Sequence, residues 1–217
     1  MTYTGVVEQG GPADVREVPG LRITKVCTPP FTNNCYLVRC TATGDTLLVD
    51  AAGDAPRLLE LVGDGRLVGI AQTHGHWDHV QALAEVRQAS GAPVLAHAGD
   101  AADLPVPPDR LLEDGDTVEV GAARLSVVHL LGHTPGSVAL VYQGDPERPH
   151  VFSGDSLFPG GPGRTTTPAD FGTLMDDLER KIFGSLPDHT WFYPGHGDDS
   201  TLGAERPSIP EWRARGW

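Results

Sequence analysis

The feature that constrains this chain most is a histidine-rich run, His74-Gly75-His76-Trp77-Asp78-His79. It follows a predicted buried strand, Leu67–Gln72, and precedes a predicted amphipathic helix, Val80–Ala89. Residues two apart are rotated by about 200° on a regular helix, so the first two histidines can face one cavity only from an irregular loop. Gly75 gives the backbone that freedom. One strand-to-helix turn therefore offers four side chains able to bind a metal: His74, His76, Asp78 and His79.

Three later segments place further candidate ligands directly after short apolar strands. His133 follows a predicted apolar strand, Asp155 follows Val151–Phe152, and His196 follows Trp191–Tyr193. Each alone is typical of a hydrogen-bonded turn residue, but with the first run they supply five histidines and two aspartates. Ligands bind at the carboxyl ends of strands in open sheets, so we expect these side chains to meet at one sheet edge.

The remainder of the chain alternates short apolar runs with Gly, Pro and Asp. Strands are predicted at Leu21–Val26, Cys35–Val38, Thr46–Val49, Leu67–Gln72, Pro93–Ala96, Thr117–Val120, Arg124–His129, Ser137–Val141, His150–Ser153 and Trp191–Tyr193. Helices are predicted at Pro56–Val62, at Val80–Ala89 and along an apolar stripe from Phe171 to Ile182. This order predicts an α/β (α+β) fold, with sheets sandwiched between helices in a single domain over residues 1–217.

The composition of the chain limits the classes of molecule that it is expected to bind. With 16 basic and 29 acidic residues the formal net charge is −13, which argues against a nucleic-acid or anionic-membrane partner. No apolar run approaches the roughly 20 residues of a membrane helix, and Met1–Gln9 has no signal-peptide pattern. Cys27, Cys35 and Cys40 are interpreted as buried thiols in a reducing compartment, so we expect a cytoplasmic protein. Nine histidines in an acidic chain favour a bound transition metal.

The ordered set of candidate ligands resembles the metallo-β-lactamase-fold hydrolase superfamily, and the segment Asn33–Val38 is also similar to that family. The resemblance implies a four-layered αβ/βα sandwich. It implies one metal held by His74, His76 and His133, a second held by Asp78, His79 and His196, and Asp155 as the bridge. The cofactor implied is a pair of Zn²⁺ ions, with Fe²⁺ or a mixed zinc–iron site as the alternative.

Within the superfamily, the segment Gly154–Thr165 is similar to the glyoxalase II-like hydrolases. In that group a basic residue at the position of Arg164 binds a carboxylate of glutathione, which makes Arg164 a candidate substrate-binding residue. An ordinary surface arginine is the alternative. The sequence departs from the group at Thr166, where an aromatic residue is usual, and in the short stretch after His196, so we expect no C-terminal helical glutathione-binding domain. These departures argue against S-lactoylglutathione as the specific substrate. The expected substrate is a small molecule, with an anionic thiol conjugate as the leading class.

The resemblance also implies a mechanism, in which a hydroxide that bridges the two metals hydrolyses a thioester. One metal polarises the carbonyl, and a thiolate leaving group needs no strong general acid. Asp78 is the candidate catalytic residue, because it can orient the attacking water besides binding metal.

Three other functions stay open. A persulfide dioxygenase on the same fold would hold one iron with His74, His133 and Asp155. A lactonase or β-lactamase-like hydrolase would use the same centre on a cyclic substrate. A metal-storing or structural protein is disfavoured, because a closed structural zinc site needs only about four ligands.

The remaining histidines carry weaker expectations. His97 follows a predicted strand and is expected behind the metal ligands. His129 is expected in the core, whereas His150 and His189 are expected in solvated turns. Trp77 could either wall the pocket or pack in the core.

Overall fold

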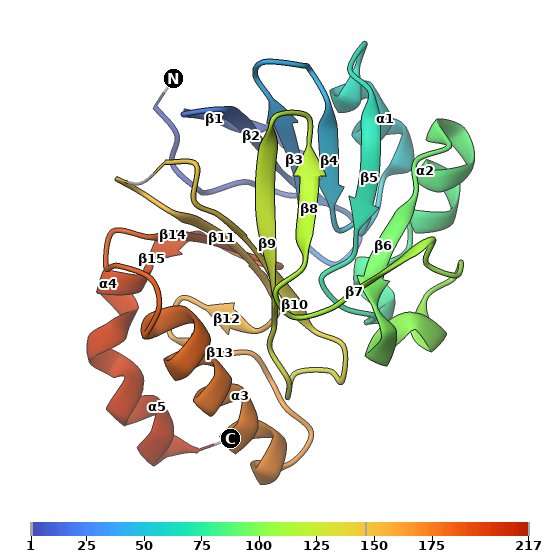
Figure 1. Cartoon of the computed structure of the whole chain (residues 1–217). Helices are drawn as coiled ribbons and strands as arrows, with labels where there is room; N and C mark the ends of the chain where they lie inside the picture. The colour runs from blue at the N-terminus through green and yellow to red at the C-terminus, as the bar shows by residue number, and fades with distance from the viewer. Residues whose placement is uncertain (1, 146, 217) are drawn as a thin grey trace.

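The computed structural model describes residues 2–145 and 147–216 of the chain. Two β-sheets pack face to face, and helices cover the outer face of each sheet (Figure 1). One hydrophobic cluster fills the space between the sheets, and one lies between each sheet and its helices. The expected four-layered αβ/βα sandwich is confirmed.

The first sheet has seven strands in the order of the sequence. They are β1 (Asp14–Val18), β2 (Leu21–Thr28), β3 (Asn33–Cys40), β4 (Thr46–Val49), β5 (Leu67–Ala71), β6 (Val94–His97) and β7 (Arg110–Leu112). Strands β1 to β4 are antiparallel neighbours, whereas β4 to β7 run parallel to one another. The carboxyl ends of β4, β5 and β6 therefore share one edge, and the histidine run begins there.

The second sheet has six strands in the order β15-β14-β11-β10-β9-β8. They are β8 (Thr117–Val120), β9 (Ala123–His129), β10 (Val138–Tyr142), β11 (His150–Gly154), β14 (Trp191–Pro194) and β15 (Ser200–Thr201). A separate ribbon of β12 (Leu157–Phe158) and β13 (Gly161–Pro162) follows β11. Because β11 and β14 are parallel, Asp155 and His196 leave the sheet at the same edge.

In the part of the chain that the structure describes, helices α1 to α5 cover the two sheets (Figure 1). Helices α1 (Ala55–Val62) and α2 (Leu83–Ser90) pack on the first sheet. Helix α3 (Pro168–Asp177), its π-helical continuation Leu178–Phe183, α4 (Leu202–Glu205) and α5 (Ile209–Arg215) pack on the second. Helix α1 shows why these residues form a helix at this place. The Asp54 carboxylate accepts the Arg57 N–H at the start of the helix, and Leu58 is fully buried against the sheet. Burying one such leucine stabilises the fold by about 2 kcal/mol.

The predicted strands and the helices at α1 and α3 are confirmed to within a few residues. The helix predicted at Val80–Ala89 begins only at Leu83, because a 3₁₀ turn at Trp77–His79 and a bend precede it. Strands β7, β12, β13 and β15 have only two or three residues, which is too short for a periodic pattern, and three of the five residues of β1 are charged, so the sequence analysis missed these five strands. No helix in the described ranges combines the length and the apolar composition that crossing a membrane requires.

Two predictions about histidines are wrong. His150 is fully buried in β11, where its ring stacks on Tyr193 and its Nδ1 lies 2.9 Å from the Tyr193 hydroxyl. Burial lowers the pKa of His150 to about 4, so the ring is neutral. His129 is half-buried instead of in the core, and its ring stacks on His97 with the centroids 4.1 Å apart.

Candidate metal centre

All seven candidate ligands converge at one edge of the sandwich, where the two sheets meet. The first sheet contributes the run from His74 to His79, which leaves the carboxyl end of β5. The second sheet contributes His133 from the loop between β9 and β10, Asp155 directly after β11, and His196 after β14. Each side chain thus comes from a loop that begins where a buried strand ends, as the sequence pattern predicts.

The first group consists of His74, His76 and His133, whose ligand atoms all lie within 4.8 Å of one another. Their ring centroids are 4.6–4.9 Å apart. The Nε2 atoms of His74 and His133 are buried and have no hydrogen-bond partner among the described residues. A buried nitrogen left unpaired in this way is costly, and a bound cation would satisfy it.

The second group consists of Asp78, His79 and His196. His196 Nε2 lies 3.2 Å from His79 Nε2 and 3.3 Å from Asp78 Oδ2, and His79 Nε2 lies 3.8 Å from Asp78 Oδ2. Two imidazoles and one carboxylate that face each other at these distances form a suitable donor set for a transition metal.

Asp155 lies between the two groups. Its carboxylate is 3.3 Å from His79 Nε2 and 3.6 Å from His196 Nε2 on one side, and 3.8 Å from His133 Nε2 on the other. Its Oδ1 is buried without a hydrogen bond of normal geometry. The position between the groups suits a bridging carboxylate, and the unpaired atoms, which are Nε2 of His74, Nε2 of His133 and Oδ1 of Asp155, fit a bound cation.

Hydrogen bonds behind three of the rings turn their Nε2 atoms toward the centre. His74 Nδ1 lies 3.1 Å from Thr73 Oγ1, His79 Nδ1 lies 3.0 Å from Asp50 Oδ2, and His133 Nδ1 lies 2.7 Å from the Arg164 carbonyl. With Nδ1 engaged, the Nε2 lone pair is available for a metal.

Asp50, which the sequence reasoning missed, supports two parts of the histidine run. Its carboxylate accepts the Thr73 N–H and the Thr73 hydroxyl, each at 2.7 Å, besides facing His79 Nδ1. It is buried and has a left-handed backbone, with φ of 56°. Asp50, His74 and His79 also form a cluster of potential ligands, but the hydrogen bonds of Asp50 account for its position. An aspartate directly after the buried strand β4 was the available signal.

Asp100 was also missed, and it joins the two halves of the site. Its carboxylate accepts the Gly75 N–H at 2.8 Å, the Thr134 hydroxyl at 2.6 Å and the Gly136 N–H at 2.6 Å. Asp100 thereby fastens the histidine run to the loop that carries His133. It occupies the position behind the ligands that was expected for His97, whose ring instead stacks on His129.

Asn33 is a third residue of the site without an assigned role in the sequence. Its Nδ2 lies 2.9 Å from Asp78 Oδ2 and 3.2 Å from His196 Nε2. Asn33 pairs with His196 in an isolated bridge, and the residue before His196 is Gly195. A Cβ at Gly195 would lie 2.1 Å from Asp155 Oδ1. Only glycine fits at position 195.

Burial and neighbouring charges act in opposite directions on the pKa values of the candidate ligands. Burial lowers the pKa of His74 well below its usual value. Burial also opposes protonation of His79, but the Asp155 and Asp50 carboxylates outweigh it and raise the pKa of His79 to about 10. Burial raises the pKa of Asp155, yet the surrounding histidines hold it well below its usual range. The site therefore favours positive charge at its middle, where a metal ion would compete with a proton.

The mouth of the centre is a cavity of about 340 Å³ lined by His76, His133, Arg164, Thr165 and Thr166. The Arg164 side chain is exposed at this mouth. Trp77 is 62% exposed and packs edge-on against Phe31, so it does not pack in the core.

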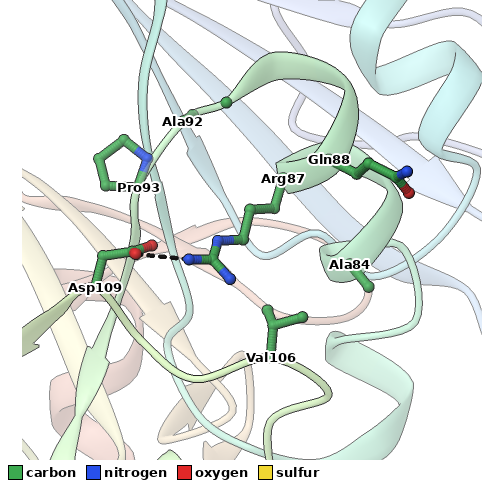
Figure 2. Close-up of a pocket in the computed structure, with 8 residues that line it drawn as sticks. Ala84, Arg87, Gln88, Ala92, Pro93, Val106 and Asp109 are labelled. Carbon is green, nitrogen blue, oxygen red and sulfur yellow. Dashed lines mark hydrogen bonds and ion pairs between the residues drawn. The ribbon is translucent and has the colours of Figure 1, made fainter.

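A larger hollow, of about 620 Å³, is lined by residues of helix α2, of the segment after it and of the loop before β7 (Figure 2), and none of the candidate ligands lines it. Arg87 and Asp109 line it and pair with each other at 2.6 Å, as the dashed line in Figure 2 marks. The hollow combines small apolar side chains with one satisfied ion pair and offers no group of converging ligands.

The comparisons with known proteins agree with this geometry. Residues 28–196 match the family model described as the metallo-beta-lactamase superfamily. A hydroxyacylglutathione hydrolase of Fuscovulum blasticum is 40% identical over 167 residues, covering 76% of this chain and 62% of that enzyme. The hydroxyacylglutathione hydrolase GloC of Haemophilus influenzae is 30% identical over 201 residues, covering 83% of this chain and 92% of that protein. The crystal structure of TTHA1623 in a di-iron-bound form has a TM-score of 0.72 and 35% identity, covering 86% of this chain and 98% of the other. The chain thus spans less than two thirds of the Fuscovulum enzyme.

Proposed function

The chain belongs to the metallo-β-lactamase superfamily, and on that premise we propose that it is a dinuclear metal hydrolase that acts on thioesters. The observation that carries this proposal is the convergence of two groups of ligand atoms on Asp155, with buried nitrogens of His74 and His133 left unpaired.

In this proposal His74, His76 and His133 hold one metal, Asp78, His79 and His196 hold the other, and Asp155 bridges them. Two Zn²⁺ ions suit this nitrogen-rich donor set, and when bound they supply Lewis acidity for activating water and stabilising an oxyanion. Asp50 and Asp100 keep the ligand loops in register through their hydrogen bonds.

Asp78 is proposed to orient the attacking water. Its side chain is 20% exposed, so solvent reaches it, and Asn33 holds one of its oxygens at 2.9 Å. A carboxylate fixed on one side and open on the other can accept a hydrogen bond from water and define the water's direction.

The composition of the mouth favours a thioester. The side chains that line it are imidazoles, threonine hydroxyls and one guanidinium, and none of them is a carboxylic acid that could protonate a poor leaving group. A thiolate departs without such a proton. Arg164 is proposed to bind an anionic part of the thiol carrier, because a guanidinium pairs with a carboxylate in a bidentate manner.

The relatives support the same class of substrate. Two of them are hydroxyacylglutathione hydrolases, and the Haemophilus protein is matched along 92% of its length. These relatives favour hydroxyacylglutathiones, which the sequence analysis disfavoured as the specific substrate. We include them in the proposed substrate class, and the buried thiols of Cys27, Cys35 and Cys40 favour a reducing compartment such as the cytoplasm.

Iron is the competing metal, because TTHA1623 at 35% identity was solved in a di-iron-bound form. A centre that worked with a single iron on His74, His133 and Asp155 would instead suit a persulfide dioxygenase.

The test is a substrate panel with the purified protein. We expect saturable hydrolysis of S-D-lactoylglutathione that is lost on chelation, restored by Zn²⁺ and lost in Asp155→Ala. The matched control is Asp109→Asn, which changes an aspartate far from the centre. Faster turnover of a homoserine lactone or a cephalosporin would replace thioesters with cyclic substrates. Oxygen uptake with glutathione persulfide would replace the hydrolase with the dioxygenase.

A further inference from the structure

A fully buried ion pair lies behind the turn that carries His196. The side chains of Lys25, in β2, and Asp199, directly before β15, are both 0% exposed, and Lys25 Nζ lies 2.6 Å from Asp199 Oδ1. Taking an ammonium and a carboxylate out of water is costly, so such a pair is favourable only where its geometry is good and its remaining hydrogen bonds are made. The groups to which these bonds run are therefore held firmly.

Lys25 directs its ammonium at the turn after His196. Its Nζ donates to the Gly197 carbonyl at 2.8 Å and to the Gly5 carbonyl at 2.7 Å, besides the bond to Asp199. These bonds use all three protons of the ammonium. Gly197 has a left-handed backbone, with φ of 72°, and is exposed to solvent. Its position therefore depends on the hydrogen bonds to its carbonyl.

Asp199 closes the same turn from its other end. Its Oδ2 accepts the Tyr3 hydroxyl at 2.5 Å and the Trp191 Nε1–H at 3.0 Å. Trp191 begins β14, the strand that leads into the turn, so this bond joins the two ends of the segment 191–199. Tyr3 and Gly5 lie before β1 and pack so closely on the pair that a Cβ at Gly5 would lie 2.9 Å from Asp199 Cβ.

The first sheet also holds the turn through two residues of β3. Lys25 in β2 pairs with Tyr36 in β3, so their side chains share the face of the sheet that Asn34, two residues before Tyr36, also occupies. The Tyr36 hydroxyl donates to the Pro194 carbonyl at 2.6 Å. Asn34 Nδ2 donates to the same carbonyl at 2.9 Å and to the Gly197 carbonyl at 2.8 Å. The backbone is thus held on both sides of the ligand histidine.

The ring of His196 depends on this backbone more than the other rings do on theirs. Three of the ligand rings have a hydrogen bond behind them at Nδ1. Within residues 2–145 and 147–216, the polar contacts of His196 are all at Nε2, the atom that faces the centre. With no bond behind the ring to fix its direction, the position of the turn decides where Nε2 lies.

We propose that Lys25 and Asp199 are positioning residues for His196, and that through it they set the affinity of the second ion, which Asp78, His79 and His196 hold. This proposal rests on the proposed dinuclear centre, which supplies that ion. Neither side chain reaches a ligand atom, so both act through the backbone of the turn. The first ion, held by the other group of histidines, is independent of them.

The experiment is a double-mutant cycle between Lys25→Met and His196→Ala, measured by Zn²⁺ titration of metal-free protein against a competing chelator. Lys25→Met should weaken the second ion about 10-fold and not abolish it, because Asn34 keeps its bond to the Gly197 carbonyl. The first ion should stay within about twofold of wild type. In the His196→Ala background the same substitution should change no affinity, whereas a merely structural role would lower the affinity in both backgrounds.

Two further variants separate positioning from folding. Lys181→Met is the matched control, because the other lysine of the chain also contacts a backbone carbonyl and an aspartate but lies on the outer helix of the second sheet. It should bind both ions like wild type. The double variant of Lys25→Met and Asp199→Leu leaves no unpaired charge in the core, so it should keep the fold. It should still weaken the second ion about 10-fold.

A metal-free measurement keeps the two proposals separate. Diethyl pyrocarbonate, followed by peptide mass spectrometry, should modify His196 at least about threefold faster in Lys25→Met than in wild type or Lys181→Met. If wild type binds fewer than two ions while this difference persists, the dinuclear centre fails and the positioning role stands. If Lys25→Met leaves both the second ion and the reactivity of His196 unchanged, or weakens the two ions equally, the positioning role is overturned.

Discussion

Replacing Asp50 by asparagine removes one oxygen acceptor behind the metal centre and keeps the shape of the side chain. In the structure one carboxylate oxygen accepts the Thr73 N–H, and the other faces the Thr73 hydroxyl and His79 Nδ1. The asparagine amide can keep the first bond but presents N–H groups in place of the second oxygen. His79 must then turn its lone pair to Nδ1 and carry its proton on Nε2, where it cannot bind a metal.

The size of the effect follows from these bonds. Loss of a hydrogen-bond partner behind a metal-binding histidine costs roughly 10–100-fold in metal affinity, or about 1.4–2.7 kcal/mol. The fold itself should lose about 1–3 kcal/mol, since one charge-assisted bond is lost. The backbone adds no penalty, because asparagine tolerates the left-handed conformation that position 50 adopts.

The assay is a Zn²⁺ titration of metal-free protein against a competing chelator. We expect wild type to bind two ions. In Asp50→Asn the ion at His79 should be weakened by about 10–100-fold, and the ion at His74 should be weakened less, because Asp50 reaches His74 only through the Thr73 hydroxyl. Asp109→Asn, which pairs with Arg87 far from the centre, should bind both ions like wild type. Two ions bound to Asp50→Asn with unchanged affinity would refute the role of Asp50 in setting the His79 tautomer.

Three further results are expected. Asp78→Ala should lower kcat for a thioester by at least about 100-fold while the circular dichroism spectrum stays that of wild type; wild-type kcat would exclude the proposed role on water. His150→Phe should make the free energy of unfolding less dependent on pH. The pKa of His150 is about 4 in the folded protein and about 6.5 in an unfolded chain, so the unfolded chain binds more protons as the pH falls. The free energy of unfolding of wild type should therefore fall by about 2 kcal/mol more than that of the variant between pH 7.5 and pH 5. Urea unfolding at the two pH values measures this difference, and parallel losses would contradict it. Chelation should lower Tm by about 10 °C, with recovery on adding Zn²⁺, whereas an unchanged Tm would argue against metal bound in the core of the site.

The layers of the fold were predictable because they depend on patterns that a sequence carries locally. Helix α3 shows apolar residues at helical spacing along one face, and Leu174 and Met175 are indeed buried against the second sheet. The short strands β12 and β13 have only two residues each and depend on their pairing with one another. Such pairing is a long-range property without a local signature.

The candidate ligands were predictable for a similar reason, but the residues that hold the ligand loops in place were not. His74 to His79 form a dense run, and His133, Asp155 and His196 each follow an apolar strand. Asp100 sits in an ordinary turn sequence, yet it accepts three hydrogen bonds from two distant loops. Its role depends on which loops the fold brings together.

The surroundings of single side chains were the least predictable part. His150 next to a proline looked like a turn residue, but β11 runs through the middle of the second sheet and buries it. In the sequence Arg215 is one of three arginines near the C-terminus, with Arg206 and Arg213, and no local pattern sets it apart. Only the packing of α5 beside the ribbon β12–β13 brings it to a cavity that Arg164 also lines.

Elemental analysis of metal content per chain tests the dinuclear hydrolase most directly. The protein would be expressed without added metal and measured beside the Asp155→Ala variant. We predict close to two metal ions per chain in wild type, mainly zinc, and fewer than two in the variant, because Asp155 lies between both groups of ligands. One iron per chain with no second metal would contradict the dinuclear centre, and two ions retained in Asp155→Ala would contradict the bridging role of Asp155.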